Sequence, residues 1–217
     1  MQLLRQFQAM LAGIYDLPDG EDVAHFLLAD RAQLPAAQQD SPAEEQLLVA
    51  EQPDGLALGL YLAPELLARL ARRDPRDGLA GDNLADCWTA LEGVSHFTYV
   101  GFHARHDRPV SLHELELQAE VDKFVCSLWL LAGQQPTRSP AGLHELLFAR
   151  SHVDVARAGE LAPMYRRASG WAARYCGRLA GHARTAARSL PPAALCELRR
   201  FYRLTNGGKL RWIARHA

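Results

Sequence analysis

The sequence predicts a mainly α-helical protein, a bundle-like array of about eight helices with one β-hairpin near residues 46–62. Two observations predict this fold. Apolar residues recur every three or four positions through most of the chain, which is the spacing of a buried helix face. One stretch instead carries two short apolar runs around Pro53-Asp54-Gly55, a turn sequence that is typical of a hairpin.

The predicted elements before the hairpin are short. An amphipathic helix is expected over residues 2–15, a second short helix over 21–29 and an exposed loop over 31–43. After the hairpin, Pro64 opens a helix that runs to about Arg72, because proline is tolerated in the first turn of a helix.

A long helical hairpin is predicted over residues 82–132. Asp82 or Asn83 caps its first helix, Pro109 interrupts the pair, and Ser111 begins the second helix with a capping-box pattern. Polar and apolar residues alternate over 114–122, which is typical of a strand. Most of these residues are good helix formers, so a helix is favoured and a strand stays the alternative.

The remaining elements are also helical. A linker is expected over 133–142, followed by helices over 141–150 and 159–184 and by a helix from Pro191-Pro192 to Tyr202. Asn206-Gly207-Gly208 is expected to break the chain before a terminal helix with the sequence KLRWIARH. The predicted regions are 1–134 and 139–217, packed together as one domain.

Charge separates these two regions. The 217 residues carry a net charge of −1, but residues 1–156 hold 11 Lys and Arg against 23 Asp and Glu. Residues 157–217 hold 13 Lys and Arg, and their acidic residues are Glu160 and Glu197. We therefore expect an acidic N-terminal region and a basic C-terminal region.

The composition and the N-terminal residues indicate the cellular compartment in which the protein is expected. The sequence has no run of 18 apolar residues and no secretory leader pattern at MQLLRQFQAML, so we expect a cytoplasmic protein that does not interact with membranes. The four cysteines form no Cys-x-x-Cys pair and are expected to be buried thiols. The 22 arginines against two lysines are typical of a bacterial chain from a GC-rich genome.

One candidate site lies on the helical hairpin. Glu92 and His96 are four residues apart on the first helix, as are Glu116 and Glu120 on the second. If the helices pair antiparallel, His96 faces Glu120. Imidazole and carboxylate together can bind zinc or a divalent transition metal. The full predicted metal set comprises Glu92, His96, His103, His113, Glu116 and Glu120.

A second candidate site is the basic C-terminal region. Its arginines lie on successive helices and are interleaved with aromatic residues, a pattern that indicates nucleic-acid or other polyanion binding. The same charges would also suit docking on the acidic region of the chain. The predicted polyanion-binding set comprises Arg166, Arg167, Arg174, Arg178, Arg199, Arg200, Arg203, Lys209 and Arg211.

These sites lead to two hypotheses. The first is a non-enzymatic protein that binds an acidic partner, nucleic acid or protein, through its arginine-rich C-terminal helices. The alternative is a metal-dependent hydrolase or oxidase with a Glu/His site on residues 92–120. The sequence has no phosphate-binding loop, Gly-x-Ser-x-Gly, His-Glu-x-x-His or dinucleotide-binding motif, so whether the protein is an enzyme stays open. A homo-oligomer is compatible with either hypothesis.

Overall fold

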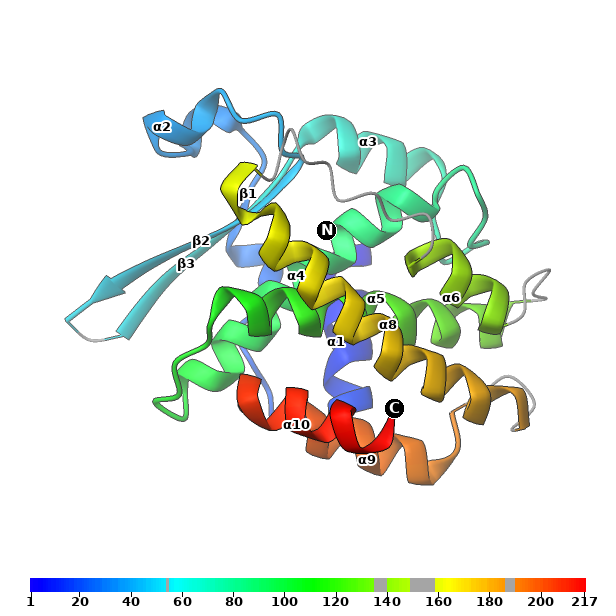
Figure 1. Ribbon diagram of the computed structural model, residues 1–217. Helices are drawn as coiled ribbons and strands as arrows, with labels where there is room; N and C mark the ends of the chain where they lie inside the picture. Colours follow the sequence, from blue (N-terminus) through cyan, green and yellow to red (C-terminus); the bar gives the residue numbers. More distant parts are fainter. Residues whose placement is uncertain (54, 135–139, 149–158, 186–189) are drawn as a thin grey trace. The chain divides into compact units, whose positions relative to one another are not determined.

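A computed structural model describes residues 1–53, 55–134, 140–148, 159–185 and 190–217. In these residues the protein is 67% helical, with nine α-helices and a small mixed sheet of three strands, which confirms the predicted fold class. Figure 1 shows the helices and the hairpin in chain order. The chain forms two compact units: unit 1 is Met1–Ala12 with Leu17–Pro109, and unit 2 is Gly13–Asp16 with Val110–Ala217.

Unit 1 contains the sheet and the helices that precede the turn at Pro109. Helix α1 begins in this unit and ends in unit 2. The elements are α1 (Gln2–Tyr15), η1 (Val23–His25), β1 (Leu27–Leu28), η2 (Arg31–Gln33), α2 (Ala36–Gln39), β2 (Glu45–Gln52), β3 (Gly55–Leu62), α3 (Pro64–Arg72) and α4 (Leu84–Ala104).

The sheet has the order β1-β3-β2. Strands β2 and β3 are antiparallel, with Glu45 opposite Leu62 and Gln52 opposite Gly55, so they form the predicted hairpin. Strand β1 pairs in parallel with β3 through Leu27 and Leu28. The prediction of a helix over 21–29 is therefore wrong, because these leucines pair with residues more than thirty positions away rather than with their own neighbours.

Helix α4 packs on β2 and β3 in unit 1. Arg69 of α3 connects this helix to the residue that precedes β2. Its guanidinium donates hydrogen bonds to both carboxylate oxygens of Asp86 at 2.8–3.1 Å and to both of Glu44 at 2.9–3.1 Å. Hydrogen bonds with Asp86 and then Glu44 raise the pKa of Arg69 above its ordinary value. Because a guanidinium fork matches two carboxylates in a fixed geometry, this group orients three elements at once.

The secondary-structure elements in the described residues of unit 2 are all helices. Its elements are α5 (Leu112–Gly133), α6 (Pro140–Phe148), η3 (Gly159–Leu161), α8 (Ala162–Thr185), α9 (Pro192–Tyr202) and α10 (Asn206–His216). Helix α8 packs against α5, α6 and α10, and Figure 1 shows it crossing α5 and running beside α6. Residues 114–122 are part of α5, so the helix favoured for them is confirmed.

Several predicted boundaries differ from the structure. The expected loop over 31–43 contains η2 and the single-turn helix α2. Asn206-Gly207-Gly208 does not break the last helix but begins it, because Thr205 caps the end by accepting a hydrogen bond from the Gly208 amide at 3.3 Å. The two units meet in sequence at Pro109, whereas the predicted regions meet at 135–138, which lie outside the described residues.

All four cysteines lie in the described part of the chain, and none of them forms a disulfide. Cys87, Cys126 and Cys176 are buried as expected, while Cys196 is exposed on α9. Burial raises the pKa of the Cys87 thiol to about 12, and nearby Asp74 adds to this effect. Within the described part of the chain, no helix is long and apolar enough to cross a membrane.

Candidate functional site

The first half of the predicted metal set lies on α4 in unit 1. Glu92 and His96 are one turn apart, and His96 is 4% exposed. Its Nδ1 lies 3.5 Å from Oε1 of Glu45, a half-buried residue at the start of β2. Glu45 was not among the predicted site residues, because it belongs to a strand and only the packing of that strand on α4 brings it to this helix. A histidine paired with a carboxylate is thus present in unit 1.

His103 has a different environment on the same helix. Its Nδ1 accepts a hydrogen bond from Nε of Arg108 at 2.8 Å, and the same guanidinium donates to the Tyr99 hydroxyl at 3.0 Å. The imidazole ring also packs edge-on against Tyr99 with 4.3 Å between ring centres. His103 therefore helps to anchor the turn that follows α4.

The second half of the set lies on α5 in unit 2. His113 Nδ1 is 3.0 Å from Oδ1 of Asn206, and Oε1 of Glu120 accepts a hydrogen bond from Lys123 at 2.7 Å. Glu116 is 8% exposed. The six-residue metal set combines residues of both units, and it stays a prediction.

The predicted polyanion set lies on α8, α9 and α10, all in unit 2. Arg178 and Arg199 are half-buried. The exposed members are Arg166, Arg167, Arg174, Arg200, Arg203 and Arg211. Most of the set is therefore accessible to solvent.

Lys209 is an exception within the predicted set, because it is buried. It has no exposed surface, because α10 begins at Asn206 and thereby places Lys209 on the same buried face as Ile213, one turn later. Its Nζ donates a hydrogen bond to Oε1 of Gln118 and lies 4.7 Å from the centre of the Phe201 ring. Lys209 is a core residue of unit 2 and is not part of the exposed arginine surface.

Gln118 connects Lys209 to a buried polar cluster. Its Nε2 donates to Oδ1 of Asp122 at 2.7 Å and to the Tyr15 hydroxyl at 3.2 Å, and that hydroxyl also bonds Asp122. Tyr15, Gln118 and Asp122 are each at most 1% exposed. Burial, followed by the negative charge of Asp122, raises the pKa of Tyr15 well above its ordinary value, so the phenol stays protonated as a donor.

Two of the arginines contribute to the end of α1. Arg199 and Arg203 donate to carbonyl oxygens of residues Gly13–Asp16 at distances between 2.9 and 3.4 Å. The last carbonyls of a helix have no partner within the helix. These two side chains therefore satisfy backbone groups, and their charges are partly committed to the fold.

Two further arginines, Arg174 and Arg178, lie over aromatic rings of α8 and α10. Arg174 lies 5.0 Å from the centre of the Trp171 ring, and Arg178 lies 4.5 Å from that of Trp212. Arg178 also forms an ion pair with Glu197. Arg167, Trp171, Arg174 and Arg178 recur at spacings of four, three and four residues, so they share one face of α8.

Comparisons with known proteins assign neither a family nor a function to this chain. No protein-family model matches the sequence, and searches of curated proteins and of solved structures found no significant match.

Proposed function

We propose that the exposed arginine surface of unit 2 binds the phosphate backbone of a nucleic acid. The observation that carries this proposal is the exposure of Arg166, Arg167, Arg174, Arg200 and Arg211 on three neighbouring helices. Residues 157–217 contain two acidic residues, and one of them, Glu197, pairs with the half-buried Arg178. Arginine is suited to this partner because its planar guanidinium binds phosphate through two parallel hydrogen bonds.

The spacing on α8 fits an extended polyanion. From Arg167 to Arg178 the helix advances by about 16 Å, at a rise of about 1.5 Å per residue. This length corresponds to about five nucleotides of one DNA strand at a rise of about 3.4 Å. Trp171 lies on the same face between two arginines, where an aromatic ring can stack on a base.

We expect the full-length protein to bind a fluorescein-labelled oligothymidylate with an affinity that falls linearly with the logarithm of salt concentration. Fluorescence anisotropy at several NaCl concentrations measures this slope. The double substitution Arg167→Gln with Arg174→Gln should weaken binding about tenfold and flatten the slope by about 1.4, since each phosphate contact contributes about 0.7 on single strands.

The matched control is Arg72→Gln with Arg73→Gln, which removes the same charge from exposed positions of unit 1. This control should leave affinity nearly unchanged. Equal losses in both double variants would mean that only net charge matters and would overturn the proposal. Binding of polyglutamate without binding of the oligonucleotide would also overturn it in favour of an acidic protein partner.

As a second candidate we propose a metal-dependent enzyme centred on His96. It is supported by the Glu45 carboxylate beside this buried imidazole, with Glu92 one turn away on α4. Carboxylates of this kind would balance the charge of zinc or of a divalent transition metal, and an open ligand position would hold the reacting water.

The metal hypothesis predicts stoichiometric metal in the purified protein by inductively coupled plasma mass spectrometry. His96→Ala should remove it, as should Glu92→Ala on the same helix. His25→Ala, which changes an exposed histidine of unit 1, should not. Metal-free wild-type protein that gains no thermal stability from added Zn²⁺ would rule this candidate out.

A further inference from the structure

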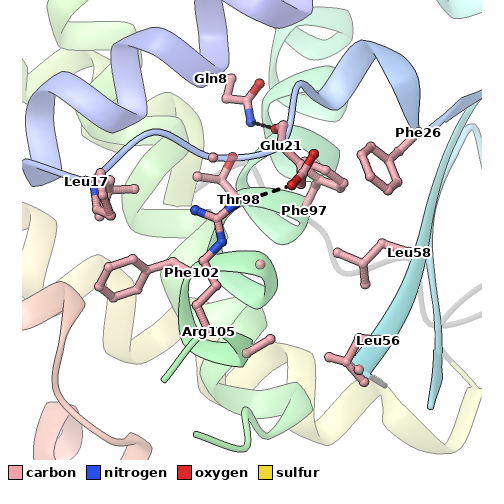
Figure 2. A pocket seen from close by; sticks show the side chains of 15 residues that line it. Gln8, Leu17, Glu21, Phe26, Leu56, Leu58, Phe97, Thr98, Phe102 and Arg105 are labelled. Carbon is pink, nitrogen blue, oxygen red and sulfur yellow. Dashed lines mark hydrogen bonds and ion pairs between the residues drawn. The ribbon is translucent and has the colours of Figure 1, made fainter. Parts of the chain in front are cut away.

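Unit 1 contains a cavity of about 430 Å³ that neither candidate function uses. It is bounded by the segment that follows α1, by strand β3 and by the second half of α4, and every residue that lines it belongs to unit 1. Figure 2 shows Leu56 and Leu58 on β3 at one side of this space and the side chain of Arg105, the residue after α4, beside Glu21. The volume lies within the range typical of small-molecule sites, about 300–1,000 Å³.

Leucines of β3 form one wall of the cavity, and this apolar wall extends beyond the buried core of unit 1. Leu56, Leu58 and Leu60 lie on one face of the strand, because alternate residues point the same way. Leu60 is fully buried, but Leu58 is half-buried and Leu56 is 41% exposed. The stripe of leucines thus continues past the core of unit 1 and lines an open cavity.

Aromatic rings complete the apolar lining. Phe26 follows η1 and contacts Phe97 of α4, with 5.1 Å between ring centres, and Phe102 lies further along the same helix. Phe97 is buried, whereas Phe26 and Phe102 are half-buried. These rings give the cavity an apolar interior that favours a hydrocarbon or aromatic ligand body.

Two charged groups belong to this lining, Arg105 and Glu21. Arg105 is the cationic one. Its Nη1 donates to the carbonyl oxygen of Asp19 at 2.5 Å, which fixes the direction of the guanidinium. Its Nη2 lies 3.8 Å from Oε1 of Glu21, too far for a hydrogen bond, and the Glu21 side chain is 71% exposed. Because a guanidinium carries five N–H donors, Arg105 retains donors for an anionic group that enters the cavity.

We propose that this cavity binds a small monocarboxylate with an apolar body. The carboxylate would accept hydrogen bonds from Arg105, and the body would cover Leu56, Leu58 and the aromatic rings. The volume corresponds to about fourteen heavy atoms, taking about 30 Å³ for each as for a water molecule. Glu21 opposes the binding of any anion, so a single carboxylate group suits the site better than a more highly charged ligand.

The test compares 4-phenylbutanoate with 4-phenylbutanamide, which has the same shape and no charge. Isothermal titration calorimetry on the full-length protein should give tighter binding of the carboxylate by about tenfold or more. Arg105→Met should remove this preference while keeping the weaker binding of the amide. Glu21→Gln should strengthen carboxylate binding, because it removes the nearby negative charge.

Arg72→Met is the matched control, since it removes an exposed arginine of unit 1 outside the cavity, and it should change neither affinity. Equal affinities for the two compounds in wild-type protein would overturn the proposal, as would a preference that survives Arg105→Met. Absence of binding at millimolar concentration of both compounds would overturn it as well. Tighter binding of zwitterionic phenylalanine than of 4-phenylbutanoate would assign the site to an amino acid instead.

Discussion

The substitution Lys209→Ala is expected to lower the free energy of unfolding by about 3–5 kcal/mol, through a lost buried hydrogen bond and the cavity left in the core. Lys209 is fully buried in unit 2, where its ammonium bonds Gln118 and lies near the rings of Phe201 and Tyr202. Removing it leaves the buried Gln118 carbonyl without its ammonium donor. It also leaves a cavity beside two aromatic rings, so the losses of hydrogen bonding and packing act together.

Urea denaturation followed by circular dichroism measures this change. Lys209→Met retains the length and most of the volume of the side chain, so it should cost less than half as much as the alanine variant. Arg215→Ala, an exposed change on the same helix, should remain within about 0.5 kcal/mol of wild type. A cost below about 1 kcal/mol for Lys209→Ala would show that the lysine is not part of a buried polar cluster.

The same cluster explains the alternation that made residues 114–122 look like a strand. Glu114, Gln118 and Asp122 follow one another at four-residue spacing on α5, and all three are buried. They are polar because they meet polar partners far away in sequence: the Asn206 amide, the Lys209 ammonium and the Tyr15 hydroxyl. Helical periodicity assumes that a buried face is apolar, so it could not identify this one.

Sequence patterns were sufficient to predict the start of a helix where the residues that begin it are neighbours in the sequence. Pro64 begins α3, and Ser111 begins α5 by accepting a hydrogen bond from the Glu114 amide at 3.3 Å. Asn83 also precedes a helix, but its side chain bonds Ala80, Arg73 and Gly78 instead of the first turn of α4. Its position was predictable, while its role in ordering the preceding loop depends on the folded loop.

The candidate sites were less predictable, because exposure and pairing depend on tertiary structure. The sequence shows where the arginines lie on the helices but not which of them are exposed. Lys209 is buried, Arg178 pairs with Glu197, and Arg199 and Arg203 bond the end of α1. The Glu45–His96 pair and the cavity beside Arg105 required the packing of a strand on a helix. No spacing within either segment encodes that contact.

Gly93 controls this packing, and Gly93→Val is expected to destabilise the protein by about 3 kcal/mol. A Cβ at this position would lie 2.8 Å from Cγ of Glu45 and 2.8 Å from Cδ1 of Leu60. Both distances are too short, so α4 would have to move away from β2 and β3 or these side chains would have to shift. Leu60 is fully buried and has little room to do so. Gly93→Ala should cost less, about 1–2 kcal/mol, because alanine favours a helix over glycine by about 1 kcal/mol.

Gly101 lies on the same helix but, unlike Gly93, has room for a side chain. A Cβ there would meet nothing within 4 Å, so Gly101→Ala should stabilise the protein by about 0.5–1 kcal/mol through helix propensity alone. Thermal and urea denaturation therefore test whether Gly93→Ala and Gly101→Ala change the free energy of unfolding in opposite directions. Stabilisation by Gly93→Ala would contradict the close approach of α4 to the hairpin. Since Glu45 lies both against Gly93 and beside His96, that result would also remove the structural basis for a carboxylate–histidine pair in unit 1.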